Sequence, residues 1–168
     1  QRPRPRPRPR LPPRRPSPWR RPLRRRRRPL PAAPQSAISN QQSSNQALDG
    51  SSVEGQTALH GACSADWASC AALLVAQGAS VDARSLSGCT PLYAACVEGS
   101  RDCARLLIAA SAAVDLASGD GSTPLYGACE QGRHECVELM LRSHARTDAA
   151  THAGLSPLMI AASNGHPE

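Results

Sequence analysis

The chain has 168 residues, enough for about one domain. All 20 basic side chains are Arg; 14 of them lie between Arg2 and Arg28, whereas all 13 acidic residues lie from Asp49 onward, so a basic beginning precedes an acidic body. No apolar stretch approaches the roughly 20 residues that would span a membrane, and no secretory signal follows Gln1, which argues against membrane and secreted proteins. We therefore expect a cytoplasmic location, with the nucleus as the alternative.

Residues 1–34 alternate Arg with Pro and then form a run of Arg. Such a segment buries too little apolar surface to offset its ordering entropy, and Pro removes backbone donors, so it is predicted to be a disordered tail. Residues 35–54, rich in Ser, Gln and Asn, are predicted to be a polar linker. Because the chain begins with Gln1 instead of Met, we expect the true start to lie elsewhere.

Three interpretations of the Arg/Pro-rich tail remain open. It could bind nucleic acid phosphates or act as a nuclear-import signal, in which case the cluster that matters is Arg24, Arg25, Arg26, Arg27 and Arg28. It also carries the Arg-x-x-Pro-x-x-Pro spacing of ligands for SH3 domains, at Arg10, Pro13 and Pro16. Alternatively, the composition reflects a GC-rich gene and residues 1–34 are not translated.

From Gly55 onward the sequence repeats with a period of 33 residues. Leu59, Leu92, Leu125 and Leu158 are each one period apart, and Gly, Thr, Pro and Ala positions recur at the same step. A fixed period of this size is typical of a solenoid of stacked units. The period divides the body into residues 55–87, 88–120, 121–153 and a truncated copy at 154–168. Since the last copy stops before its second helix, we expect the chain to be a fragment.

Each unit is predicted to contain two helices and a projecting turn. In Thr90-Pro91-Leu92, Thr suits the N-cap and Pro the first helical position, so a short helix should begin there and end by Gly99. A second helix is predicted over about 101–110, with Cys103, Leu106 and Leu107 on one face. The fold class is therefore all-α, a solenoid of helix-turn-helix units with projecting turns.

These units resemble the ankyrin repeat. The resemblance is carried by Gly88-Cys89-Thr90-Pro91-Leu92, its copy beginning at Gly121, and the stretch from Leu73 to Asp82, and it extends over residues 55–168. The family's His after Thr-Pro-Leu is present only as His60, in Thr57-Ala58-Leu59-His60, and is replaced by Tyr93, Tyr126 and Met159. In the family that His ties the loop to the helix start, so the later loops are expected to be held differently.

The seven cysteines are interpreted as packing residues. Cys63, Cys96 and Cys129 share one repeat position, and Cys70, Cys103 and Cys136 share another, as expected for small buried apolar side chains. No Cys-x-x-Cys pair is present, and no catalytic motif such as Gly-x-Ser-x-Gly or His-Glu-x-x-His occurs. We therefore expect no metal, no cofactor and no enzymatic activity in these residues.

The resemblance implies protein binding on the concave side, by turn tips and the exposed flank of the first helices. By position, the candidate contact residues are Arg84, Leu86, Tyr93, Glu98, Asp120, Tyr126, Glu130 and His152. Tyr93 and Tyr126 could form an aromatic ladder at a binding hot spot. Alternatively, both fill the family's His position and pack locally.

Within the family, Thr-Pro-Leu-Tyr followed by Ala-Cys, with a Cys opening the second helix, resembles the ankyrin repeat and SOCS box proteins. That resemblance implies a substrate-recognition subunit of a cullin-RING ubiquitin ligase, docked to elongin B/C and a cullin through a SOCS box beyond Glu168. The alternatives are a general ankyrin scaffold or adaptor in signalling or cytoskeletal assembly, and a nuclear factor that binds nucleic acid through its Arg-rich tail.

Overall fold

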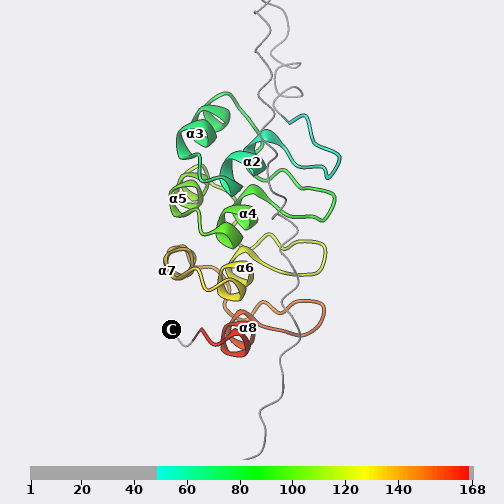
Figure 1. The fold of residues 1–168 in the computed structure, drawn as a ribbon, viewed down its shortest axis with the longest axis vertical. Helices are drawn as coiled ribbons and strands as arrows, with labels where there is room; N and C mark the ends of the chain where they lie inside the picture. The colour runs from blue at the N-terminus through cyan, green and yellow to red at the C-terminus, as the bar shows by residue number, and fades with distance from the viewer. Residues whose placement is uncertain (1–48, 167–168) are drawn as a thin grey trace, which may run out of the picture. The chain divides into compact units, whose positions relative to one another are not determined.

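A computed structural model describes residues 49–166, in which the helices follow one another as antiparallel pairs (Figure 1). These residues form seven helices and no β-strand: α2 (Ala58–Ser64), α3 (Ala68–Ala76), α4 (Pro91–Glu98), α5 (Arg101–Ala109), α6 (Pro124–Glu130), α7 (His134–Arg142) and α8 (Pro157–Asn164). The predicted all-α repeat fold is confirmed.

The helices form two rows. The first helices of the pairs, α2, α4, α6 and α8, pack on one another in succession, and α3, α5 and α7 form an outer row beside them (Figure 1). The turns that connect successive pairs project away from the outer row (Figure 1). We call the surface formed by the first helices and these turns the turn-side face.

The first helices begin at the predicted caps. The hydroxyl oxygen of Thr90 accepts a hydrogen bond from the Tyr93 N–H at 3.1 Å, Thr123 does the same for Tyr126 at 3.3 Å, and Ser156 does so at the start of α8. Pro occupies the first helical position in these three helices, where its missing N–H costs no helical hydrogen bond.

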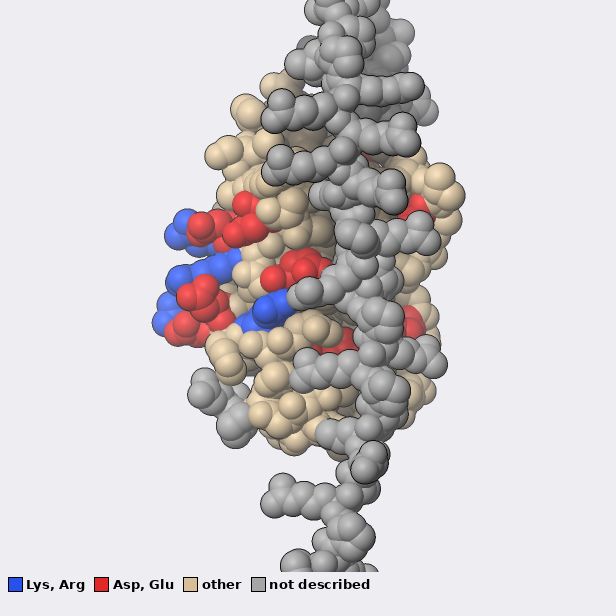
Figure 2. Space-filling model, in the orientation of Figure 1, with Lys and Arg blue, Asp and Glu red and all other residues tan. Residues whose placement is uncertain are grey.

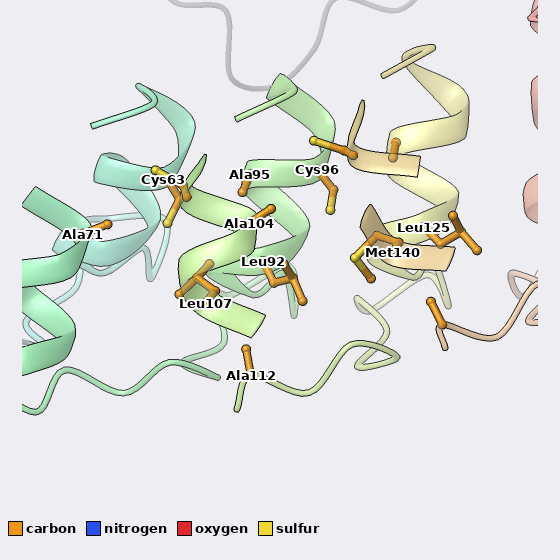
Figure 3. Close-up of a cluster of buried hydrophobic side chains, with 14 of the residues drawn as sticks. Cys63, Ala71, Leu92, Ala95, Cys96, Ala104, Leu107, Ala112, Leu125 and Met140 are labelled. Atoms are coloured by element: carbon orange, nitrogen blue, oxygen red, sulfur yellow. The ribbon is translucent and has the colours of Figure 1, made fainter. Parts of the chain in front are cut away.

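A continuous apolar core lies between the two rows. Leu92, Leu107 and Met140 are completely buried, and small Ala and Cys side chains fill the space between helices of adjacent repeats (Figure 3). Because each repeat covers the next, the core extends along the stack. On α8, the last described helix, the side chains of Leu158 and Met159 are 77% and 57% exposed.

The prediction that all six repeat-position cysteines are buried is wrong for one of them. Cys70 is exposed, whereas its counterparts Cys103 and Cys136 are fully buried; Leu73 on the same helix is also exposed. The reason is position in the stack: α5 packs between α3 and α7, but α3 has only α5 beside it among the outer helices of residues 49–166.

Three residues other than Gly adopt the left-handed backbone conformation between helices and turns. Asp66 has φ 56°, in keeping with the tolerance of Asp for this region, and Ser111 and His144 have φ 66° and 59° where the first repeat has Gly78. Ser111 and His144 are therefore in the backbone geometry that favours Gly.

The projecting turns are joined from repeat to repeat by backbone hydrogen bonds. The N–H of Leu86 donates to the Glu54 carbonyl, Gly119 to Ser87, and His152 to Asp120. At the base of the turns, each of three carboxylates accepts a hydrogen bond from a backbone N–H about one repeat later. Asp49 accepts from Ser80, Asp82 from Ala113, and Asp115 from Arg146. These two ladders fix the spacing of the turns along the stack.

Candidate functional site

A pocket of about 330 Å³ opens on the turn-side face between the second and third repeats. Five of the eight predicted contact residues line it: Tyr93, Asp120, Tyr126, Glu130 and His152. Residues from α4, α6 and two successive turns therefore meet at one place, although they are separated by up to 59 positions in the chain (152 − 93). The lining also includes Ser122, Thr151, Ala153 and Leu155, which the sequence did not single out.

The other three predicted contact residues lie outside the lining of this pocket. Arg84 uses its guanidinium to donate to the Ala117 carbonyl at 2.8 Å, so it ties one turn to the next. Leu86 is 82% exposed at a turn tip, which makes it an apolar side chain available for contact. Glu98 is half-buried at the end of α4.

The two tyrosines occupy equivalent positions but are not equally accessible. Tyr93 is half-buried and Tyr126 is only 7% exposed. The Tyr93 ring lies against α6 at Gly127. A Cβ atom added to Gly127 would be 3.3 Å from Cε2 of Tyr93 and 2.8 Å from Cγ2 of Val97. Both tyrosines thus pack against neighbouring residues and also face the pocket, so neither of the two interpretations of this pair excludes the other.

Burial raises the pKa of both Tyr93 and Tyr126, so the phenols are neutral. The negative charges of Glu130 and Asp120 add to the increase in both cases. The charges of both carboxylates therefore act on both phenol groups.

Asp120 is held in place by its own turn. Its Oδ1 accepts hydrogen bonds from the Ser118 hydroxyl at 2.5 Å and the Ser122 N–H at 3.0 Å. Desolvation opposes ionisation, but these hydrogen bonds outweigh it and lower the pKa of Asp120. The carboxylate is consequently ionised at neutral pH and fixed at the pocket edge.

The turn bearing His152 closes the pocket. The His152 N–H donates to the Asp120 carbonyl at 2.9 Å, and its ring lies beside Gly121, where an added Cβ would be 3.0 Å from Cδ2. Gly121, with φ +87°, permits both the turn and this close approach. The pocket is thus framed by backbone contacts between two repeats.

The first repeat shows how its turn is held by His60, which the later repeats lack. His60 Nδ1 accepts the Thr57 N–H at 3.1 Å, so Nε2 carries the proton and donates to the Cys89 carbonyl at 3.0 Å. A hydroxyl oxygen also holds turns in repeats with and without this His: Ser52 accepts the Gln56 N–H, Ser85 the Cys89 N–H, and Thr151 the Leu155 N–H. Because this hydroxyl contact is common to these turns, the expectation that the later loops are held differently stays a prediction.

Charged residues of both signs gather over α5 and α7 (Figure 2). Arg105 pairs with Asp102 at 3.1 Å, Arg142 with Glu138 at 2.6 Å, and Arg101 approaches Glu135 at 3.9 Å. These exposed ion pairs contribute little stability, but they neutralise one another's charge. The outer edge is therefore mixed in charge, whereas the pocket lining holds two carboxylates and no Arg.

Within residues 49–166, no group of three or more His, Cys, Asp and Glu side chains is placed to hold a metal ion. No described helix is both long and apolar enough to cross a membrane. All seven cysteines, each within the described part of the chain, are free thiols.

The sequence matches a known protein family. The family described as Ankyrin repeats (3 copies) matches residues 34–118 and 111–168. The chain belongs to the ankyrin repeat family. No match was found among the curated proteins. The ankyrin fold is typically a non-enzymatic module for protein–protein interaction, and this is the function that membership supports.

Several predictions fall on residues that the structure does not describe. The Arg cluster Arg24–Arg28 and the SH3-ligand spacing at Arg10, Pro13 and Pro16 both lie outside residues 49–166, as does most of the 35–54 linker. Their proposed roles therefore stay predictions from the sequence.

Proposed function

We propose that this ankyrin stack binds a partner protein through its turn-side face, with the pocket between the second and third repeats at the centre of the contact. The observation that carries this proposal is the convergence of Tyr93, Asp120, Tyr126, Glu130 and His152 on one pocket. Tyr is one of the residue types enriched among the energetically dominant residues of protein interfaces, which cluster in well-packed pockets.

The exposed apolar side chains at the turn tips extend this surface. Leu86 is 82% exposed and Leu155, which lines the pocket, is 40% exposed. Neither is required to fill the core between the helix rows. A partner that covered both would remove apolar area from water, which favours association.

Photo-crosslinking of the full chain tests this proposal. A photoreactive amino acid is placed at Leu86 on the turn-side face or, as the matched control, at Leu141 on α7, which is 47% exposed. We expect a defined crosslinked protein from position 86 and none from position 141. Crosslinking from 141 alone would overturn the choice of face, and no crosslink from either would overturn the binding proposal.

A finer role rests on the resemblance to ankyrin repeat and SOCS box proteins. We propose that the partner is a substrate of a cullin-RING ubiquitin ligase, with elongin B/C and a cullin as further partners and the cytoplasm as the location. Support comes from the Cys and Tyr pattern, although Cys96, Cys103 and Cys136 are also explained by burial. Co-purification of elongin B/C with the longest natural transcript product supports this role, and its absence contradicts it.

The general scaffold and the nucleic-acid-binding nuclear factor are the alternatives. The latter predicts that the full chain binds mixed-sequence DNA with an affinity that falls steeply as salt increases, because Arg residues release counterions from the phosphates. Weak binding that is indifferent to salt would rule it out. Crosslinking at Leu86 to a cytoskeletal or signalling protein without elongin B/C would favour the scaffold.

A further inference from the structure

The chemistry of the pocket between the second and third repeats indicates which side chain it accepts; this inference rests on the proposed function of the turn-side face. Two aromatic residues and two carboxylates line the pocket, and no Arg does. At about 330 Å³ it is large enough to accept one long side chain, and small for a drug-sized ligand.

Gly127 keeps the aromatic part of the pocket in place. Because Gly127 has no side chain, the Tyr93 ring can lie against α6 beside Tyr126. The phenol rings are neutral, and the face of a neutral aromatic ring attracts a cation. A positive group in the pocket would therefore be attracted to an exposed ring face.

The carboxylates supply the opposite charge. Asp120 is fixed by Ser118 and Ser122, and Glu130 is half-buried at the end of α6. The nearby Arg133 is directed elsewhere, since its Nε donates to the Val97 carbonyl at 3.1 Å and its aliphatic part covers Gly99. The negative charge in the pocket thus has no Arg partner within the lining.

We propose that this pocket binds the guanidinium group of an arginine side chain presented by the partner protein. A guanidinium is planar, stacks on aromatic rings and can donate two parallel hydrogen bonds to a carboxylate, whereas an ammonium group is a compact and strongly hydrated point charge. The combination of the half-buried Tyr93 ring with Asp120 and Glu130 therefore favours arginine over lysine.

Peptide titration of the full chain tests this assignment. The probes are blocked peptides of alternating Gly and Arg, Gly and Lys, or Gly and Glu, with binding followed by backbone amide NMR shifts. We expect the Arg peptide to bind and to shift amides of residues 118–130 and 151–155, the Lys peptide to bind several-fold more weakly, and the Glu peptide not to bind. Equal affinity for Arg and Lys, or shifts confined to α5 and α7, would overturn the proposal.

Two variants and a charge-matched control locate the interaction. Glu130→Gln and Tyr93→Leu are each expected to weaken Arg-peptide binding roughly tenfold, the scale of a hydrogen bond to a charged group for Glu130 and of a desolvated cation–aromatic contact for Tyr93. Glu135→Gln removes the same charge from α7, where the side chain is 70% exposed, and should change affinity by less than about twofold, as expected for an exposed pair. Equal losses in Glu130→Gln and Glu135→Gln would show diffuse attraction and contradict a defined pocket.

The peptide titration and the crosslinking experiment can fail independently of each other. A crosslinked partner at Leu86 without any Arg-peptide binding would refute the arginine pocket and leave the turn-side face intact as a binding surface. Arg-peptide binding without a crosslink would support the pocket and contradict the proposed protein contact around it. Circular dichroism of each variant confirms that it is folded before binding is measured.

Discussion

Gly127 offers a sharp test of the packing that shapes the pocket, because a matched glycine exists two repeats earlier. Gly61 occupies the same position in α2 as Gly127 in α6 (127 − 61 = 66, twice the period of 33). An added Cβ meets nothing within 4 Å at Gly61, but at Gly127 it lies 2.8 Å from Val97 Cγ2 and 3.3 Å from Tyr93 Cε2.

The expected change in unfolding free energy has opposite signs at the two sites. Replacing a helical Gly with Ala contributes about 1 kcal/mol through helix propensity, so Gly61→Ala should stabilise the fold by about that amount. At Gly127 the same gain is offset by overpacking, which costs about 1–3 kcal/mol, and Val97 can relax little because its β-branched side chain is stiff at χ1. Gly127→Ala should therefore destabilise the protein by about 1 kcal/mol.

Urea denaturation of the full chain, followed by helical circular dichroism, measures both variants against the unsubstituted protein. We expect the midpoint to rise for Gly61→Ala and to fall for Gly127→Ala. If both variants were stabilised equally, the Tyr93 ring and Val97 could not lie against α6 as described. The geometry assigned to the pocket would then be refuted.

Three further predictions concern thiols, acid stability and turns. Only Cys70 should react at once with a disulfide reagent in the folded protein, since the other six thiols are buried, and burial raises the pKa of Cys103 to about 11. Stability should fall as pH drops below 6.5, because burial lowers the pKa of His60 in the folded state, so the unfolded chain binds the proton more strongly; urea midpoints of His60→Gln should vary less over this range. Ser111→Gly and His144→Gly should each stabilise by about 0.5–1 kcal/mol in urea denaturation, since Gly relieves the positive φ.

Each of these predictions has a clear contrary result. Prompt reaction of several thiols would show that the core opens readily, and a slow Cys70 would contradict its exposure. An unchanged acid dependence in His60→Gln would assign the loss of stability to other groups. Loss of stability in Ser111→Gly or His144→Gly would mean that entropy in the unfolded chain outweighs the backbone strain.

The period of 33 predicted the helix pairs because the signals are local. Thr90 and Pro91 set the start of a helix through contacts within one turn, and these contacts are present in the structure. Burial was predicted less well, as Cys70 shows, because the same residue type is buried or exposed according to which neighbours the stack provides. Sequence position alone carries no information about that.

The pocket was predicted only in part. The positions of Tyr93, Asp120 and His152 followed from the repeat register, but their convergence depends on how successive turns bond to one another. The recurrence of Asp49, Asp82 and Asp115 at intervals of 33 was visible in the sequence and could have revealed the ladder that spaces these turns. The role of Gly127, by contrast, could not be predicted from the sequence, because it depends on the Tyr93 ring that packs against it in the structure.

The central claim is that the partner covers the turn-side face. Hydroxyl-radical footprinting tests it most directly, because the chain has no Lys for common crosslinkers but carries oxidisable side chains on both faces. With the partner identified by crosslinking, we predict reduced oxidation at Leu86, Tyr93 and His152 and unchanged oxidation at the exposed Leu73 and Leu141. Protection of Leu73 and Leu141 with no change at Leu86 and His152 would contradict the claim.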